Sequence, residues 1–208
     1  MSAPTRLLIA TGNAGKAREF AEMLGGRADV CFLKAFPDAR EVPETGLTFR
    51  ANACLKAAGY AKQTGLWTIA DDSGLEVDAL GGAPGVYSAR YAERADAGTG
   101  DAANNALLLL RLGDIPAEQR TGRFVCVLAL ADPEGRVALT ARATMEGRIV
   151  RAPRGDNGFG YDPLFEIAAL GRTTAELAPA EKHAISHRGQ ALATLKRLMD
   201  GRWPPAVG

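Results

Sequence analysis

Residues 69–75 place two neighbouring carboxylates directly after an apolar run. Residues 67–70 predict a buried strand with Asp71 and Asp72 at its carboxyl end, where open α/β sheets bind their ligands. Two adjacent carboxylates repel each other unless a cation lies beside them, and their hard oxygens favour Mg²⁺ over zinc. The alternative is an Asx turn in which Asp72 caps a solvated loop. The segment therefore predicts either a metal-phosphate site at a sheet edge or a surface turn.

The length and charge of the chain limit the kinds of partner it can have. Its 208 residues suit one domain, spanning residues 1–208, that buries a substantial core without disulfides. Because 25 Lys and Arg residues nearly balance 24 Asp and Glu residues, no overall basic field is available for non-specific nucleic-acid binding. We therefore expect no stable nucleic-acid binding, and an anionic ligand must be met by local groups.

The cysteines and the first apolar run indicate the compartment. Cys31, Cys54 and Cys126 have no Cys-x-x-Cys spacing and lie in apolar surroundings, which predicts buried free thiols in a reducing cytosol. The apolar run at residues 7–10 is too short for a signal peptide or a membrane span. We expect a soluble cytoplasmic protein without membrane association.

The first strand-turn-helix unit carries a candidate anion site. Residues 7–10 predict a strand, and a helix that stops at Gly25-Gly26 follows from the helical spacing of Ala17, Phe20, Ala21 and Leu24. The turn between them reads Thr11-Gly12-Asn13-Ala14-Gly15-Lys16. Backbone N–H groups and the helix dipole would face an anion there, although the spacing is not that of a P-loop. The alternative is a plain turn with a solvated lysine.

The next segments predict a strand, a loop and a second helix. Residues 30–33 read as a strand and residues 36–46 as a loop rich in proline and acidic side chains. A helix then begins at Thr48 and stops at Gly65, with Phe49, Ala53, Ala57, Tyr60 and Ala61 on one face. Glu44 lies just before this helix. By itself it would be dismissed as a surface charge.

Glycine-rich loops and a further helix occupy the middle of the chain. Residues 81–85 cannot continue a helix or a central strand, so they form either a close-approach loop with Arg90 available to an anion or a simple turn. A helix over residues 101–112 contains the apolar run 107–110, which predicts burial on most sides.

Residues 124–131 and 137–143 predict strands joined by the turn Asp132-Pro133-Glu134-Gly135, so the fold is expected to be α/β with a mixed sheet. Residues 151–163 then form a glycine-rich loop that includes Phe159-Gly160-Tyr161-Asp162, before another strand at residues 164–167. Such a loop could stack a base on an aromatic ring and bind its ring N–H groups with a carboxylate. The alternative is that the loop aromatics form a small satellite core.

The last helix begins near a cluster of cationic side chains. Its apolar face consists of Ala191, Leu192, Leu195, Leu198 and Met199. Ser186 is the expected N-cap, and Lys182, His187 and Arg188 lie at or before the helix start, where the dipole favours anions. His183 is expected to be a cap or a surface residue.

Six motifs together resemble the inosine triphosphate pyrophosphatase family in its bacterial branch, from about residue 8 to residue 195. They occur in family order, and each is weak alone. They are the segments 11–16, 44–49, 70–75, 80–91, 158–163 and 184–189.

The resemblance implies an elongated two-lobed α/β fold with a cleft, a homodimer, and Mg²⁺-dependent hydrolysis of ITP, dITP and XTP to the monophosphate and pyrophosphate. It implies that Glu44 and Asp72 bind the metal and that Asp72 is the general base. The implied substrate-binding residues are Thr11, Gly12, Asn13, Ala14, Gly15, Lys16, Ser73, Phe159, Gly160, Tyr161, Asp162, Lys182, His187 and Arg188.

Two positions depart from the pattern of the family. Many relatives have paired glutamates where this chain has Pro43-Glu44, and an acidic residue where it has Ala51 before Asn52. Both departures leave fewer carboxylates near the expected metal.

For the base, we expect Phe159 to stack on the purine while His187 and Arg188 donate hydrogen bonds to a 6-oxo oxygen. Adenine presents an N6-H₂ donor at that edge, so ATP would be rejected, whereas the sequence offers nothing that reads the 2-position of GTP. Two alternatives stay open: a Maf-type nucleotide pyrophosphatase with another base preference, and a module that senses purine triphosphates without cleaving them.

Overall fold

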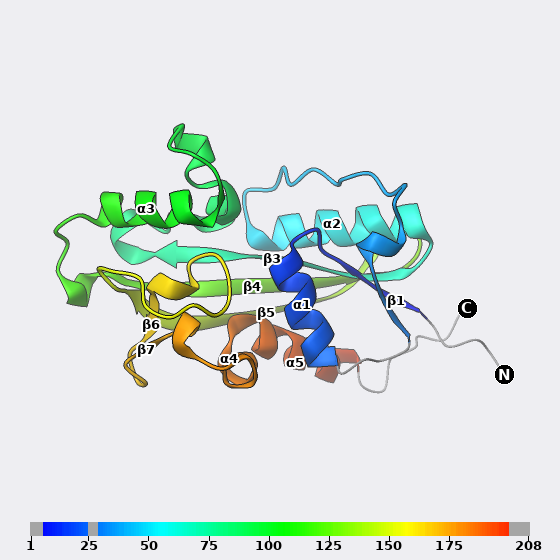
Figure 1. Ribbon diagram of the computed structural model, residues 1–208. Helices are drawn as coiled ribbons and strands as arrows, with labels where there is room; N and C mark the ends of the chain where they lie inside the picture. The colour runs from blue at the N-terminus through cyan, green and yellow to red at the C-terminus, as the bar shows by residue number, and fades with distance from the viewer. Residues whose placement is uncertain (1–5, 25–28, 200–208) are drawn as a thin grey trace. The chain divides into compact units, whose positions relative to one another are not determined.

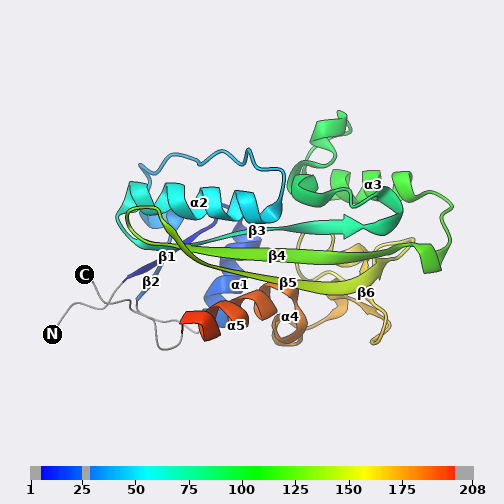
Figure 2. The ribbon, with the colours of Figure 1, turned by 180° about the vertical axis from the view of Figure 1, so that it is seen from behind.

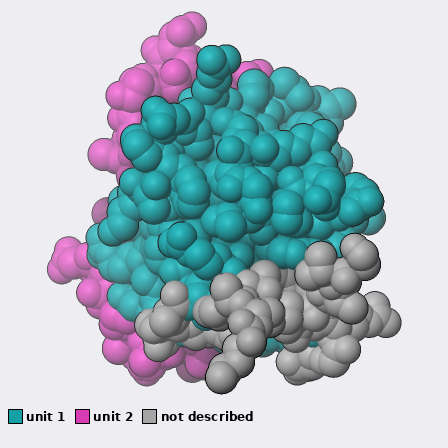
Figure 3. All heavy atoms as spheres, turned by 90° about the vertical axis from the view of Figure 1, so that its right-hand side faces the viewer, with its two compact units in different colours: residues 1–72, 126–143, 188–208 teal, residues 73–125, 144–187 magenta. Residues whose placement is uncertain are grey.

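The computed structural model describes residues 6–24 and 29–199 and consists of two compact units. Unit 1 contains residues 1–72, 126–143 and 188–208, and unit 2 contains residues 73–125 and 144–187 (Figure 3). Each unit has a hydrophobic core of its own. The expected cleft between two lobes stays a prediction.

Within the described residues, seven strands form one mixed sheet in the order β2-β1-β3-β4-β5-β6-β7. Strand β1 pairs parallel with β2 and β3, and β6 pairs antiparallel with β5 and β7, which confirms the predicted α/β fold with a mixed sheet. The strands are β1 (Leu7–Ala10), β2 (Val30–Phe32), β3 (Trp67–Val77), β4 (Thr121–Ala131), β5 (Val137–Ile149), β6 (Phe165–Ile167) and β7 (Arg172–Thr173). The helices, drawn in Figures 1 and 2, are α1 (Ala14–Leu24), α2 (Phe49–Thr64), α3 (Gly100–Leu112), α4 (Pro179–Ile185) and α5 (His187–Met199).

Unit 1 covers its part of the sheet on both faces. All four residues of β1 are buried, as expected for a parallel strand between two helical layers. Helix α2 lies on one side of the strands and α1 and α5 lie on the other (Figures 1 and 2). On the α1 and α5 side, Phe20, Leu192 and Leu195 pack against Ile9 and Ile69. This packing fixes the two segments that follow β1 and Ala70.

Local signals set the ends of α2 as predicted. Thr48 is the N-cap, and its Oγ1 accepts a hydrogen bond from the N–H of Ala51 at 3.1 Å. Gly65 ends the helix in the left-handed conformation with φ 67°. The predicted stop of α1 at Gly25-Gly26 lies outside the described residues.

Unit 2 has a core formed by α3 and the later parts of the strands. Leu108 and Leu112 of α3 are fully buried against Leu75 and Phe165, whereas Leu110 is 77% exposed. The prediction that residues 107–110 are buried on most sides is therefore wrong, because four successive residues span the whole circumference of a helix and only one side of α3 faces the core. In α5 of unit 1, the predicted apolar face is likewise incomplete, since Leu198 is 42% exposed.

The turn after β4 and the cysteines agree with expectation in most respects. The N–H of Gly135 donates to the carbonyl of Asp132 at 2.8 Å, which closes the predicted turn between β4 and β5. All three cysteines are free thiols; Cys31 and Cys126 are buried, but Cys54 is only half-buried. Among the described residues, the structure contains no helix that is long and apolar enough to span a membrane.

Candidate active site

The turn between β1 and α1 forms a helix N-terminus that is open to solvent. Asn13 is its cap: Oδ1 accepts from the N–H of Lys16 at 3.0 Å, and its carbonyl accepts the first helical bond from Ala17 at 2.9 Å. Oγ1 of Thr11 accepts from the N–H of Asn13 at 3.2 Å. Gly12, Asn13 and Ala14 are exposed, so the N–H groups at this helix start can meet an anion.

Lys16 joins this turn to a buried network of four charges in unit 1. Its Nζ lies 2.8 Å from Oδ2 of Asp71, and Nη2 of Arg188 lies 3.7 Å from the same oxygen. Nη1 of Arg188 also pairs with the carboxylate of Glu19. Burial would raise the pKa of Asp71, but the charges of Lys16 and Arg188 outweigh it and hold that pKa below its usual value. Two cations thus balance two buried carboxylates, and Asp71 stays ionised.

A second cluster in unit 1 brings Glu44 and Asp72 to one ammonium group. Nζ of Lys56 lies 2.6 Å from Oε1 of Glu44 and 3.5 Å from Oδ1 of Asp72. Burial raises the pKa of Asp72, although Lys56 and Lys16 act against that rise. Burial lowers the pKa of Lys56, but Asp71, Asp72 and Glu44 together raise it above its usual value. Sequence reasoning missed Lys56; the signal was its position one helical turn after Asn52 in α2.

The strand that carries the two aspartates is longer than predicted. Asp71, Asp72 and Ser73 lie within β3, which continues to Val77, so the prediction that the carboxylates end this strand is wrong, as is the alternative of an Asx turn. The pairing register explains the difference. Ala10 is the last residue of β1 and lies opposite Ala70, so β1 ends where β3 passes on beside β4. The carboxylates therefore stand at the carboxyl end of β1 rather than of their own strand.

The oxygens of this cluster suit a hard divalent cation. Oδ2 of Asp72 is buried and accepts no hydrogen bond from the described residues, and Glu44 and Asp72 already share one cationic group. Within residues 6–24 and 29–199, no group of three or more His, Cys, Asp or Glu side chains is placed to hold a metal. Two carboxylates fit Mg²⁺, which keeps several waters and takes further oxygens from substrate phosphates.

In unit 2, Asp162 holds the glycine-rich loop together. Its Oδ2 accepts from the N–H of Phe159 at 2.8 Å and from Nζ of Lys182 at 2.6 Å. Its Oδ1 accepts from the hydroxyl of Thr174 at 2.8 Å. Gly158 has φ 81°, and a Cβ there would lie 2.0 Å from Oδ2 of Asp162, so only glycine fits. Asp162 is therefore buried inside the loop that was predicted to present it to a base.

The two loop aromatics have different environments. Tyr161 is buried in the core of unit 2, and its hydroxyl donates to the carbonyl of Ser88 at 2.8 Å. This burial raises the pKa of Tyr161 far above its usual value. Phe159 is half-buried, and Nζ of Lys182 lies 5.1 Å from its ring centroid. The satellite-core interpretation thus holds for Tyr161, whereas Phe159 is only half-buried.

Two residues of α3 form hydrogen bonds with the backbone of Gly160. Oδ2 of Asp101 accepts from the N–H of Gly160 at 2.7 Å, and Nδ2 of Asn105 donates to its carbonyl at 3.0 Å. Gly160 has φ 63°, the left-handed region in which glycine is favoured. Sequence reasoning missed both residues. Their spacing of four positions, which places them on one side of a helix, was the available signal.

The remaining predicted residues lie around the start of α5 and in β3. His187 is buried in unit 2 and stacks on Phe124, with ring centroids 4.9 Å apart and an interplanar angle of 13°. Arg188, by contrast, belongs to unit 1. Ser186 ends α4 immediately before α5, and Ser73 is half-buried in unit 2.

The structure thus forms three groups from the predicted site residues. Lys16 and Arg188 meet at Asp71, and Glu44 and Asp72 meet at Lys56; both groups lie in unit 1. The third group, Phe159, Asp162 and Lys182, lies in unit 2. Unit 1 offers cations and hard oxygens that suit phosphates and a metal, and unit 2 offers a ring and a braced loop that suit a base.

Comparison with known proteins adds independent evidence. The sequence profile of the Ham1 family matches residues 7–198. A dITP/XTP pyrophosphatase of Exiguobacterium sibiricum is 56% identical over 93% of this chain and 96% of that protein, and one of Geobacillus kaustophilus is 52% identical over 97% and 96%. Among solved structures, a HAM1 protein from Coxiella burnetii matches with a TM-score of 0.82 and 42% identity, covering 95% of this chain and 99% of that chain. The Staphylococcus aureus Ham1 protein matches with a TM-score of 0.81 and 39% identity over the same shares.

Proposed function

This chain belongs to the Ham1 family, and from that premise we propose that it is a pyrophosphatase that hydrolyses ITP, dITP and XTP to the monophosphate and pyrophosphate. Relatives about half identical in sequence are named dITP/XTP pyrophosphatases. The observation that carries the proposal is the pairing of Glu44 and Asp72 on Lys56, in the same unit as Lys16 and the open start of α1. Removal of such nucleotides from the cytoplasmic pool is the biological role that this activity implies.

The triphosphate binds through unit 1. The N–H groups at the start of α1 donate hydrogen bonds to phosphate oxygens. They belong to the segment Thr11-Gly12-Asn13-Ala14-Gly15-Lys16. Lys16 and Lys56 are compact point charges, each now paired with carboxylates. When a triphosphate enters, these lysines contact its oxygens, and Lys16 stabilises the departing pyrophosphate.

Glu44 and Asp72 are the proposed Mg²⁺ ligands, with Asp71 nearby. The buried Oδ2 of Asp72 and the shared cation at Lys56 support this assignment. When bound, Mg²⁺ would neutralise charge that develops on the phosphate oxygens. Pro43 and Ala51, where many relatives have acidic residues, leave these two carboxylates as the main protein ligands.

Asp72 also acts on the attacking water. Burial raises the pKa of its carboxyl group, so this carboxylate is a stronger base than an exposed aspartate. Asp72 accepts the proton of water as the oxygen attacks the α-phosphorus and the bond to the bridging oxygen of pyrophosphate breaks. Asp71, whose pKa is held low by Lys16 and Arg188, stays ionised and is less suited to accept that proton.

Unit 2 supplies the base recognition. Phe159 stacks on the purine, and the loop Gly160-Tyr161-Asp162 with Ser73 and Lys182 positions it. His187 is the proposed donor of unit 2 to the 6-oxo oxygen; Arg188, the second donor predicted from the sequence, pairs with Glu19 and Asp71 in unit 1. ATP is rejected because its N6-H₂ group would face these donors.

A product assay tests the proposal. ITP, dITP, XTP, ATP, GTP, UTP and dUTP are incubated with the protein, with Mg²⁺ and with EDTA, and the products are separated by anion exchange. Rapid formation of IMP and XMP with pyrophosphate, only with Mg²⁺, is the expected result. Preference for UTP or dUTP would favour a Maf-type enzyme, and binding without pyrophosphate release would favour a sensor.

A homodimer is proposed from the family resemblance. Sedimentation equilibrium would measure the mass of the assembly.

A further inference from the structure

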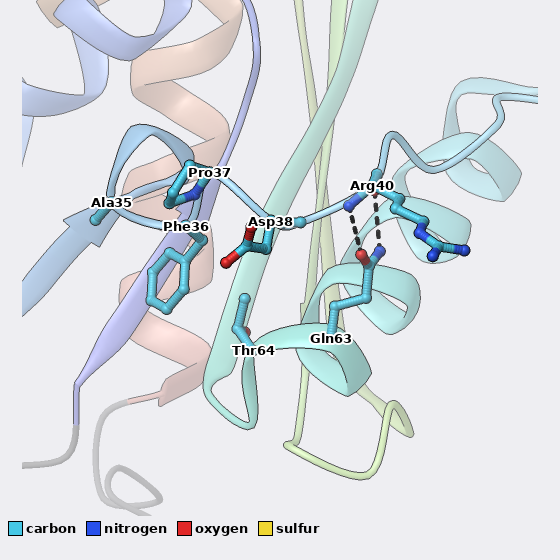
Figure 4. Close-up of a pocket in the computed structure, with 8 residues that line it drawn as sticks. Ala35, Phe36, Pro37, Asp38, Arg40, Gln63 and Thr64 are labelled. Carbon is cyan, nitrogen blue, oxygen red and sulfur yellow. Dashed lines mark hydrogen bonds between the residues drawn. The ribbon is translucent and has the colours of Figure 1, made fainter.

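The segment that carries Glu44 runs antiparallel beside α2 and contacts it at regular intervals. At one end, Arg40 is bound through its backbone by the side-chain amide of Gln63 (Figure 4). The N–H of Arg40 donates to Oε1 of Gln63 at 2.7 Å, and Nε2 of Gln63 donates to the carbonyl of Arg40 at 3.0 Å. The oxygen and the nitrogen of the Gln63 amide thus both bind the backbone of Arg40. They do so in a hollow that is also lined by Phe36, Asp38 and Thr64.

The next contacts follow one turn of α2 at a time. The N–H of Val42 donates to the hydroxyl of Tyr60 at 3.4 Å. Beside Tyr60 is Gly59, where a Cβ would lie 2.6 Å from Cγ2 of Val42, so the absence of a side chain lets Val42 approach the helix. Glycine inside a helix is otherwise unfavourable, which makes this close approach the physical reason for it.

The last two contacts lead to the metal-binding carboxylate. Glu44 reaches Lys56 at 2.6 Å, and the N–H of Gly46 donates to Oδ1 of Asn52 at 2.7 Å. A Cβ at Gly46 would lie 2.7 Å from the Cβ of Ala51, so this end is also closely packed. The segment is therefore held on both sides of Glu44.

The register of these contacts follows from the two geometries. Alternate residues of an extended segment are about 6.6 Å apart, close to the helical pitch of about 5.4 Å. Every second residue of the segment therefore meets the next turn of α2, where the contacting residues share one side of the helix. The pairs, in order, are Arg40 with Gln63, Val42 with Tyr60, Glu44 with Lys56 and Gly46 with Asn52.

The residues between these contacts, Glu41, Pro43 and Thr45, are exposed, as are Arg40 and Glu44, so the register rests on the contacts themselves and not on burial. Pro43 has no N–H group, and at this position none is needed toward the helix. The departure from the paired glutamates of many relatives thus falls on a side chain exposed to solvent.

We infer that this side of α2, defined here as the α2 rail (Asn52, Lys56, Gly59, Tyr60 and Gln63), sets the position of Glu44, and that Gln63 is a positioning residue for the metal ligand. The inference rests on the proposed assignment of Glu44 and Asp72 to Mg²⁺. Gln63 is eleven residues from Asn52 along α2, about 16 Å along the axis, so it acts through the segment and not on the metal itself.

The two hydrogen bonds between Gln63 and the backbone of Arg40 are exposed to solvent. Both Arg40 and Gln63 are exposed, and hydrogen bonds in such a setting contribute little to folding. Losing them should displace the segment with little change in stability. Glu44, whose side chain is 30% exposed, has no burial of its own that would keep it in place.

The first experiment removes the brace at Gln63. Gln63→Met keeps the length of the side chain but cannot bind the backbone of Arg40, and Gln119→Met, at an exposed glutamine of unit 2, is the matched control. Mn²⁺ alone is titrated into each protein and followed by electron paramagnetic resonance. We expect Gln63→Met to weaken Mn²⁺ binding about tenfold, the lower end of the effect of outer contacts of metal ligands, at an unchanged melting temperature. Unchanged Mn²⁺ affinity would overturn the inference.

Steady-state kinetics and hydrogen exchange separate positioning from general loosening. For Gln63→Met, the Mg²⁺ concentration at half-maximal rate should rise by the same factor as the Mn²⁺ dissociation constant, while kcat at saturating Mg²⁺ stays near that of the wild type. Amide exchange should accelerate in residues 40–46 and nowhere else. Exchange that accelerates throughout unit 1 would show a structural role only and contradict the inference.

The second experiment uses the close approach at Gly59. Gly59→Ala should force Val42 away from the helix and weaken Mn²⁺ binding about tenfold, even though alanine favours a helix. Val42→Ala alone should change binding less than about twofold, and the double variant Gly59→Ala with Val42→Ala should restore it, because the clashing methyl groups are gone. A double variant as weak as Gly59→Ala would overturn the inference.

A further variant distinguishes this inference from the proposed function. Glu44→Gln should weaken Mn²⁺ binding more than either rail variant. If Glu44→Gln binds Mn²⁺ like the wild type, the metal assignment and the inference both fail. If Glu44→Gln weakens binding while the variants at Gln63 and Gly59 do not, the assignment stands and the inference alone is wrong.

Discussion

In unit 1, Asp71 and Asp72 pair with lysines beside solvent-exposed backbone, whereas in unit 2 Asp162 binds a buried lysine together with a backbone N–H and a hydroxyl. Lys16 and Lys56 are long side chains near a solvent-open helix start and an exposed segment. Asp162 is instead enclosed by Phe159, Thr174 and Lys182. The two arrangements therefore suit different functions.

Ion pairs in unit 1 can exchange one anionic partner for another. A triphosphate brings the same kind of oxygen that Asp71 and Glu44 now offer to the lysines, so binding replaces contacts of similar chemistry. The loop of unit 2 is held by hydrogen bonds to Asp162, so we expect it to be preorganised for a base on Phe159. This comparison predicts that changes in unit 1 affect the chemical step and that changes in unit 2 affect substrate binding.

The largest effect is expected at Asp72. Asp72→Asn should lower kcat for ITP about 10²–10⁴-fold because the amide cannot accept the proton of water. Pyrophosphate release measures it, with Asp78→Asn, at an aspartate of unit 2 that pairs with Arg123, as the control. Wild-type turnover in Asp72→Asn would remove the basis for the comparison.

Arg188→Ala should cost stability before it affects recognition. It leaves Glu19 and Asp71 buried without their guanidinium, and breaking such a buried pair costs about 3–5 kcal/mol. Urea unfolding measures the loss, and the added change Glu19→Gln should recover part of it by removing one buried charge. An Arg188→Ala protein as stable as the wild type would show that these charges are not coupled. Base discrimination is thus better tested at His187.

In unit 2, Asp162→Asn should change binding more than chemistry. An asparagine could keep its oxygen toward the N–H of Phe159 and Lys182, but it would lose the charge that pairs with Lys182 and turn its NH₂ group toward the hydroxyl of Thr174, so the loop would loosen. KM for ITP should rise about tenfold to hundredfold, the equivalent of one or two lost hydrogen bonds, with a smaller fall in kcat. Steady-state kinetics with Asp156→Asn, an exposed aspartate of the same loop, provides the control. A large loss of kcat at constant KM would invert the comparison.

The smallest effect is expected from α3. Asp101→Ala removes the solvent-exposed hydrogen bond from the N–H of Gly160 to Oδ2 of Asp101. It should raise KM for ITP about twofold to fivefold, with kcat unchanged. Asn105→Ala should act in the same direction. Asp114→Ala, just beyond the end of α3, is the control and should kinetically match the wild type. If Asp101→Ala lowered kcat instead, the loop would have a part in the chemical step.

The sequence predicted those features of the fold that depend on neighbours along the chain. Thr48 and Gly65 predicted the two ends of α2, because an N-cap and a left-handed glycine act on the neighbouring backbone. The end of β3 could not be predicted in the same way, because β3 continues past Ala70 alongside β4, a strand more than forty residues later. Exposure of Leu110 likewise depends on which side of α3 meets the core.

The site was predictable where one motif contains its own chemistry. The turn at residues 11–16 and the two aspartates identify themselves by residue type and position. Lys56 could not be recognised, because a lysine on a helix resembles any solvated lysine until the segment with Glu44 returns beside it. The surroundings of Arg188 depend on Glu19, which lies 169 positions earlier in the chain.

The α2 rail also constrains how this surface can change in length. Because every second residue from Arg40 to Gly46 binds α2, inserting or deleting a single residue would shift these residues out of register, and Pro43 or Thr45 would lie opposite Lys56 in place of the glutamate. Exposed loops ordinarily accept such insertions. This one should accept new side chains at Glu41 and Thr45 but keep a fixed count of residues, so an unvarying spacing would mark it among related sequences more clearly than residue identity.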